Sequence, residues 1–291
     1  MGQTSGMDLR FRLLNVFALE GDPFSGNPLA VVTGAGGLDA TTMQRLARQF
    51  NLSESTFVTD PGAGPEDAHV RIFTPDYEMP FAGHPTLGTA FVVSDLHGGA
   101  DAVALTMPAG RIPVVREGEV WTLTANEPAV RTCSATPAEL AEALGLPVQA
   151  LSPEGYGWVD AGVEQLMVEV GDVESLRTCT PDLRALVTHA TPPGGNAQLY
   201  AWTRTGEDSV EARLFFTQGG AVAEDPATGS ACANLGGWLR SRGERGRRYA
   251  VSQGAAVSRP SALVLTLDDS DRVRVGGRVR EIGAGHLSLP G

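Results

Sequence analysis

Two short stretches decide the fold of this chain: 78–84, which reads Glu-Met-Pro-Phe-Ala-Gly-His, and 224–230, which reads Glu-Asp-Pro-Ala-Thr-Gly-Ser. Their Glu, Pro and Gly coincide when Gly83 is set against Gly229, an offset of 146 in a chain of 291 residues. Repetition at half the chain length indicates an internal duplication. The alternative is that both stretches are unrelated glycine turns that precede core helices.

The surroundings of the two glycines also match. A run of small, apolar residues follows Gly83 and another follows Gly229, while the strand-like stretches 71–73 (Arg-Ile-Phe) and 213–215 (Arg-Leu-Phe) precede them. A helix without a polar face is buried on all sides. In a chain rich in strands, this pattern predicts two helices, each wrapped by curved sheet.

The rest of the chain indicates many short strands and few helices. Alternation and β-branched residues predict strands near 10–18, 28–33, 56–59, 68–74, 102–107, 111–116, 119–125, 165–170, 197–204, 212–217, 249–253, 261–267 and 271–281. Amphipathic helices are expected to open at Asp39, at Thr136, with Pro137 at the first helical position, and at Thr180 in the same manner.

The predicted fold class is therefore α+β, with two similar domains related by a pseudo-twofold axis. Each domain is a β-barrel-like sheet around a central buried helix. We place the domains at 1–126 and 127–291, and the last strand, near 279–289, is a candidate to return to the first domain.

Composition excludes several classes of function. Hydrophobic residues make up 42% and charged residues 19% of the chain, as in globular proteins, and the formal charge is 22 − 34 = −12. An acidic chain is a poor partner for nucleic acid or anionic lipid. Apolar runs are too short for a membrane span, and residues 1–7 lack the order of a secretory signal, so we expect a cytoplasmic protein.

Metal and cofactor sites are not indicated either. Cys133, Cys179 and Cys232 stand in neither a Cys-x-x-Cys nor a Cys/His spacing. The Gly-rich stretch 34–37 has no following Lys, so it does not read as a phosphate loop. We therefore predict that the protein needs no metal and no cofactor.

The two predicted helix starts suggest a binding site for a small carboxylate. The start of a helix carries free N–H groups and about half a positive charge, and glycine lets a ligand approach the backbone. If a pseudo-twofold axis relates Gly83 and Gly229, the two starts face each other across the cleft between the domains. Such a cleft can clamp a small acid.

Four titratable or polar side chains are candidates for this cleft. His84 follows Gly83 at a helix start, where the dipole lowers the imidazole pKa and can keep the ring neutral. Asp225 and Ser230 flank Gly229, although Asp is also an ordinary helix cap. Glu54 lies between a helix and a strand, on an expected loop from which a carboxylate can point into a cleft.

Longer motifs carry a resemblance. The chain resembles the phenazine-biosynthesis PhzF-like isomerase family in the segments 24–32 (Phe-Ser-Gly-Asn-Pro-Leu-Ala-Val-Val), 51–58, 73–75, 81–88 (Phe-Ala-Gly-His-Pro-Thr-Leu-Gly), 224–231 (Glu-Asp-Pro-Ala-Thr-Gly-Ser-Ala), 253–254 and 259–261. The resemblance implies a diaminopimelate epimerase-like fold and a homodimer without cofactor. It also implies catalytic roles for Glu54, His84 and Asp225, and substrate binding by Gly83, Gly229 and Ser230. Departures from the family pattern at 218–223 and at Ser258 affect loops beside the cleft, which choose the ligand.

The leading hypothesis is proton transfer on a small carboxylic acid, with Glu54 as the acid and base. A two-base racemase or epimerase is one alternative, but relatives with that chemistry carry a Cys directly before each helix-start glycine. Here those positions are Ala82 and Thr228. A non-catalytic binding or regulatory protein on the same fold is the other alternative, and the joint presence of Glu54, His84 and Asp225 disfavours it. The sequence does not name the substrate.

Overall fold

The computed structural model describes residues 9–289, so residues 1–7, in which we looked for a secretory signal, lie outside the described part. Contacts between residues divide the chain into two compact units. The first contains the residues up to Leu123 and those from Gly276 onward, and the second is Thr124–Val275. No helix within residues 9–289 is both long and apolar enough to cross a membrane.

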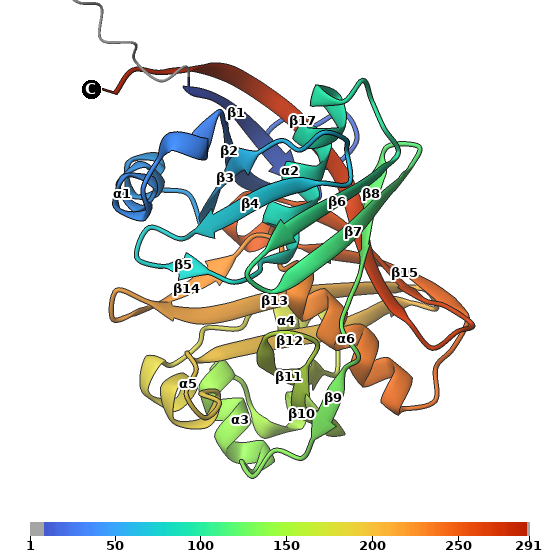
Figure 1. The fold of residues 1–291 in the computed structure, drawn as a ribbon. Coiled ribbons are helices and arrows are strands. Elements are labelled where there is room, and N and C mark those ends of the chain that lie inside the picture. The colour runs from blue at the N-terminus through green and yellow to red at the C-terminus, as the bar shows by residue number, and fades with distance from the viewer. Residues whose placement is uncertain (1–8, 290–291) are drawn as a thin grey trace, which may run out of the picture. The chain divides into compact units, whose positions relative to one another are not determined.

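The first unit is a β-barrel (Figure 1). Its strands are β1 (Leu9–Val16), β2 (Asn27–Thr33), β3 (Glu54–Asp60), β4 (Ala68–Phe73), β5 (Glu78–Met79), β6 (Ala102–Met107), β7 (Gly110–Glu117), β8 (Val120–Thr124) and most of β17 (Val273–Leu287). Hydrogen-bonded pairs run from β17 through β1, β2, β3, β4, β6 and β7 to β8, which pairs with β17 again. The pairs β2–β3 and β4–β6 are parallel and the others with printed registers are antiparallel, so each parallel pair needs a crossover, and helices supply both.

Helix α2 (Gly83–Leu96) makes the crossover from β4 to β6 through the inside of this barrel (Figure 1). Ten of its 14 residues are buried, which confirms the predicted burial on all faces. Gly88 permits the close fit, because a Cβ atom there would lie 2.4 Å from Cδ2 of Leu29 on β2. The other crossover helix, α1 (Ala40–Phe50), is capped by the Asp39 side chain as predicted.

The second unit contains the strands β9 (Ala129–Arg131), β10 (Leu151–Asp160), β11 (Glu164–Val170), β12 (Gln198–Gly206), β13 (Ser209–Gln218), β14 (Ala221–Asp225), β15 (Arg247–Gln253) and β16 (Ser261–Leu267). The pairs β11–β12 and β13–β15 are parallel. Helix α6 (Gly229–Ser241) connects β13 and β14 to β15, and ten of its 13 residues are buried. Both predicted helix starts, at Gly83 and Gly229, are thus confirmed.

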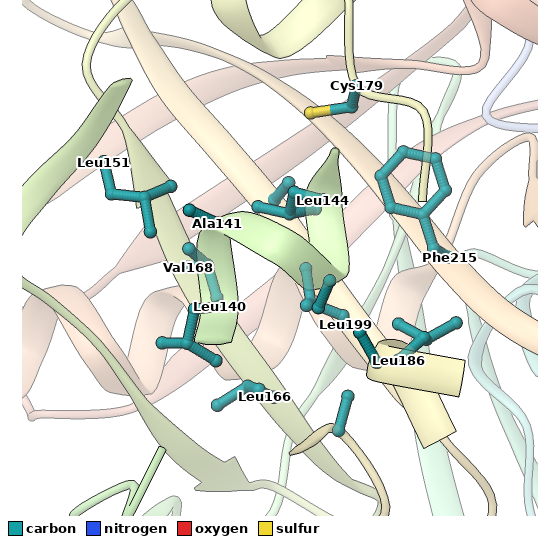
Figure 2. Close-up of a cluster of buried hydrophobic side chains, with 14 of the residues drawn as sticks. Leu140, Ala141, Leu144, Leu151, Leu166, Val168, Cys179, Leu186, Leu199 and Phe215 are labelled. Carbon is teal, nitrogen blue, oxygen red and sulfur yellow. The ribbon is translucent and has the colours of Figure 1, made fainter. Parts of the chain in front are cut away.

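Helices α4 (Val173–Arg177) and α5 (Leu183–His189) lie in the crossover between the parallel strands β11 and β12, and α3 (Pro137–Leu144) connects the antiparallel strands β9 and β10. The predicted capping box at Thr136 is present. Figure 2 shows Leu140 and Leu144 of α3 and Leu186 of α5 gathered with Leu166 and Leu199 of the sheet, and all five side chains are fully buried. This core includes residues of β11 and β12, and β11 also contacts α6.

Each unit contains an Arg–Glu ion pair at the matching position of the repeat. Arg71 on β4 binds Glu78 on β5, with 2.6 Å between Nη2 and Oε2, and Arg213 on β13 binds Glu224 on β14 at 2.7 Å. Each guanidinium also lies over the phenylalanine ring two positions later, 5.1 and 4.7 Å from the centroid. The repeated sequence therefore builds the same local structure twice, a short hairpin that leads into a buried helix.

The predicted secondary structure differs from the observed one at several places. Glu54 is the first residue of β3 rather than part of a loop. The third polar helix begins at Leu183 with Asp182 as its cap, so Thr180 does not open it. Strands β5, β9, β10 and β14 and helix α4 were not predicted, because they are short or, in β10, interrupted by Pro153, Gly155 and Gly157.

Candidate functional site

In the first unit, the predicted residues Glu54 and His84 meet. The parallel pair β2–β3 sets Leu29 opposite Glu54, and this places the start of β3 beside the start of α2. Oε2 of Glu54 lies 3.5 Å from Nε2 of His84, and the side chains are only 16% and 7% exposed. A carboxyl and an imidazole that share a shielded space can exchange a proton.

The protonation state of His84 follows from its surroundings. Burial lowers the pKa of His84 to about 3, although a hydrogen bond to the backbone of Pro28 acts in the opposite direction. Desolvation therefore keeps the ring neutral, whereas the sequence suggested the helix dipole as the cause. Proline has no N–H, so the Pro28 carbonyl must accept this bond from a ring nitrogen.

The same hydrogen bond decides the tautomer. Among the described residues, Nε2 of His84 has no hydrogen-bond partner, so Nδ1 is the nitrogen that donates to Pro28. The neutral ring then carries its proton on Nδ1 and turns the lone pair of Nε2 toward Glu54. Glu54 and His84 together form a pair of bases with room for one proton between them.

Sequence reasoning did not single out Tyr77, which directly precedes β5. Burial raises the pKa of Tyr77, and the negative charge of Glu54 raises it further, which places the phenol within electrostatic reach of the Glu54 carboxylate. The turn that carries it is fixed by Thr74, whose hydroxyl accepts hydrogen bonds from the N–H groups of Asp76 and Tyr77 at 3.1 and 3.0 Å. Tyr77 is 51% exposed. In the sequence it looks like an ordinary turn residue.

In the second unit, Asp225 ends β14 and Ser230 is the second residue of α6. The cap position of α6 is Thr228, and its hydroxyl donates to Oδ2 of Asp225. Nε2 of Gln253 donates to the Thr228 hydroxyl at 3.0 Å and to the Asp225 carbonyl at 2.8 Å. Thr228 and Gln253 thus hold the Asp225 carboxylate in one orientation.

A glycine next to Gln253 closes the same loop. Gly254 has a φ of +81°, and a Cβ there would lie 2.3 Å from the carbonyl oxygen of Pro226. Only glycine combines this left-handed backbone with such a close approach. The Gln253–Gly254 motif therefore supports the 225–228 loop from outside.

Neither cap residue, Ala82 of α2 or Thr228 of α6, makes a side-chain capping hydrogen bond to its own helix within the described residues. At the start of α6, Oε1 of Gln253 accepts the backbone N–H of Thr228 at 3.3 Å, so the N–H groups that suit a ligand are those of the following residues. The partial positive charge of the helix end lies behind them. Within residues 9–289, no group of three His, Cys, Asp or Glu side chains could hold a metal ion.

The three cysteines are poor bases. Burial raises the pKa of Cys179 to about 11 and that of Cys133 above its ordinary value, and it raises the pKa of Cys232 furthest. Cys232 is fully buried inside α6 and does not reach the helix start. Within the described residues, thiolate chemistry therefore has no suitable group.

Comparison with known proteins shows the family and the fold of this chain. The family model described as Phenazine biosynthesis-like protein matches residues 14–282. An uncharacterized isomerase of Pasteurella multocida is 36% identical over 96% of this chain and 94% of its own length. The trans-2,3-dihydro-3-hydroxyanthranilate isomerase of Pseudomonas fluorescens is 34% identical over 92% of this chain and 95% of its own. A PhzF family protein of Bacillus anthracis has the same fold, with a TM-score of 0.83 over 97% of this chain and 99% of that one at 22% identity.

Proposed function

Because this chain belongs to the phenazine biosynthesis-like protein family, it is an isomerase, and we propose that it moves a proton within a small carboxylic acid without a cofactor. The observation that carries the proposal is the shielded contact between Glu54 and His84, 3.5 Å apart at the start of a buried helix. Shielding helps a proton taken from carbon to return to the same molecule, and exchange of the carboxyl proton with solvent between the two steps is what a deuterium assay detects.

Glu54 performs both halves of the proposed reaction. As a carboxylate it takes a proton from one carbon, and the electron pair of that C–H bond moves into the conjugated system of the substrate. The protonated Glu54 then returns the proton to another carbon of the same system, so no other reactant is consumed. Nε2 of His84, with its lone pair toward Glu54, accepts a hydrogen bond from the protonated carboxyl and holds it between the two steps.

The second unit supplies the groups that bind the acid. The N–H groups at the start of α6 and the Ser230 hydroxyl are donors, which suits the carboxylate of a substrate or the negative charge that develops on it. Asp225, held by Thr228, is the acceptor beside them and suits a hydroxyl or amino group of the substrate. We propose that the substrate lies between this start and that of α2, so that Gly83 and Gly229 both approach it.

The two-base racemase is not favoured. Ala82 and Thr228 stand at the positions of its thiols, and Thr228 already serves Asp225 as a hydrogen-bond donor. The absence of a low-pKa thiol among the described cysteines points in the same direction. The homodimer implied by the family resemblance stays a prediction, as does the lack of a cofactor.

The relatives named trans-2,3-dihydro-3-hydroxyanthranilate isomerases suggest the first compound to test. We expect the purified protein to convert this compound in D₂O, and NMR of the product will locate any deuterium gained from solvent at the carbon that receives the proton. If this compound is unchanged, other unsaturated amino or hydroxy acids of similar size are tested in the same way. Failure of all to be isomerised would overturn the proposed chemistry.

A further inference from the structure

We propose that Gln165 and Asn234 are positioning residues that fix the Ser230 hydroxyl as a hydrogen-bond donor to the substrate. This inference rests on the proposed function, because it assigns Ser230 to the carboxylate of the bound acid. Neither amide touches the position proposed for the substrate. They act through Ser230, at the end of a chain of hydrogen bonds that begins at a backbone N–H.

The direction of donation along these hydrogen bonds is set by the backbone N–H of Ala161. Its backbone N–H can only donate, and it donates to Oδ1 of Asn234 at 2.8 Å. The other side of the Asn234 amide is therefore Nδ2, which donates to the Val163 carbonyl at 2.9 Å and to Oε1 of Gln165 at 2.8 Å. Each amide in the chain has one orientation that satisfies its neighbours.

The orientation of Gln165 follows from this. With Oε1 occupied by Asn234, Nε2 faces the helix start and donates to Oγ of Ser230 at 3.2 Å and to Oε1 of Gln198 at 2.7 Å. Ser230 Oγ thus accepts a bond from inside the protein. Within residues 9–289 its hydroxyl has no acceptor of its own, so its hydrogen is available to a ligand.

Burial prevents the chain from reversing. Gln165 and Asn234 are fully buried, and turning either amide would leave a backbone group or a partner amide unsatisfied away from water. One lone pair of the Ser230 hydroxyl is therefore occupied from inside the protein, and its hydrogen is left for a ligand. This preference favours an ionised carboxylate, which only accepts, over an amide or an alcohol at the same place.

The first unit has the opposite polarity at the matching position. The parallel pairs set Leu29 opposite Glu54 and Leu166 opposite Leu199, which makes Pro28 and Gln165 equivalent in the repeat. Pro28 offers a carbonyl to His84 where Gln165 offers an amide N–H to Ser230. The second residue of one buried helix thus presents a lone pair, and the second residue of the other presents a proton.

A double-mutant cycle tests the inference, with anthranilate as the probe and isothermal titration calorimetry as the measurement. Ser230→Ala should weaken binding about tenfold, the effect of a lost hydrogen bond to a charged group. Gln165→Met should weaken binding by about fivefold to tenfold when Ser230 is present and by less than about twofold in the Ser230→Ala background. Gln149→Met, the same change at an exposed glutamine of the second unit, should stay within about twofold of wild type.

Equal losses from Gln165→Met in both backgrounds would overturn the inference, because they would show a purely structural role. A second measurement tests the inference if the Gln165→Met variant does not fold or if wild type does not bind anthranilate. The side-chain ¹⁵N–¹H resonance of Gln165 should shift in Ser230→Ala, and an unchanged resonance would refute the contact. A shift without anthranilate binding would leave the positioning chain intact and count against the proposed carboxylate substrate alone.

Discussion

The substitution Glu54→Gln tests the central step of the proposed reaction with little change in shape. Glutamine has the size of glutamate but cannot carry a proton between two carbons. Nε2 of His84 has a lone pair directed at residue 54 from 3.5 Å, and the introduced amide N–H can donate to it. The variant should therefore fold normally, with a free energy of unfolding within about 1 kcal/mol of wild type.

The expected loss of activity is large. A positioned general acid and base contributes about 10² to 10⁴ in rate, and the same carboxyl serves both steps here. We expect turnover to fall by about a hundredfold or more, which raises the barrier by about 2.7 kcal/mol. Anthranilate should still bind within about threefold of wild type, because its donors belong to the second unit.

The assay is ¹H NMR of deuterium incorporation from D₂O during turnover of trans-2,3-dihydro-3-hydroxyanthranilate, with wild type and variant at equal concentration. Glu66→Gln is the matched control, since Glu66 is an exposed residue of the first unit that pairs with Arg111. The control should exchange at the wild-type rate. Equal exchange by Glu54→Gln would refute the role of Glu54 as the proton carrier and move that role to Asp225 or His84.

Three further predictions concern stability, each measured by urea unfolding. The pKa of His84 is lowered to about 3 in the folded state, so below its ordinary value near 6.5 the unfolded state binds more protons and the free energy of unfolding decreases as the pH is lowered. From pH 7 to pH 5, wild type should lose about 2 kcal/mol more than His84→Gln, and an equal loss would contradict a buried neutral ring. Arg213→Leu breaks an ion pair whose side chains are 11% and 9% exposed and should lower the free energy of unfolding by about 3–5 kcal/mol. Arg71→Leu breaks the matching pair, whose side chains are 30% and 32% exposed, and should lower it by about 1 kcal/mol. Similar losses would show that burial does not distinguish the two ion pairs. Gly88→Ala places a Cβ 2.4 Å from Leu29 and should destabilise the first unit by about 1–3 kcal/mol, while Gly283→Ala, with nothing within 4 Å, should be close to neutral, and a neutral Gly88→Ala would contradict the tight fit of α2.

The sequence alone determined the features that depend on local pattern. The two glycines that start the buried helices, the apolar runs after them and the caps at Asp39 and Thr136 act over a few residues, and each is found where it was predicted. The half-length repeat pointed to two similar structures, and the matched Arg–Glu pairs on β4–β5 and β13–β14 show how the repeated letters are used. The sequence motifs at 51–58, 81–88 and 224–231 likewise supplied Glu54, His84, Asp225 and Ser230 as candidates.

Only the tertiary structure decided what these side chains contact. His84 and Glu54 are brought together by a parallel strand pair and a helix inside a barrel, and the burial that this produces, rather than a local dipole, sets the pKa of His84. Asn234 in an apolar helix and Gln165 in an apolar strand were visible as polar residues in buried settings, yet their direction of hydrogen bonding depends on the N–H of Ala161, 73 residues away from Asn234. Local pattern fixes where a helix starts, because its causes lie within one turn; the chemistry at that start depends on desolvation and on partners that only folding brings near.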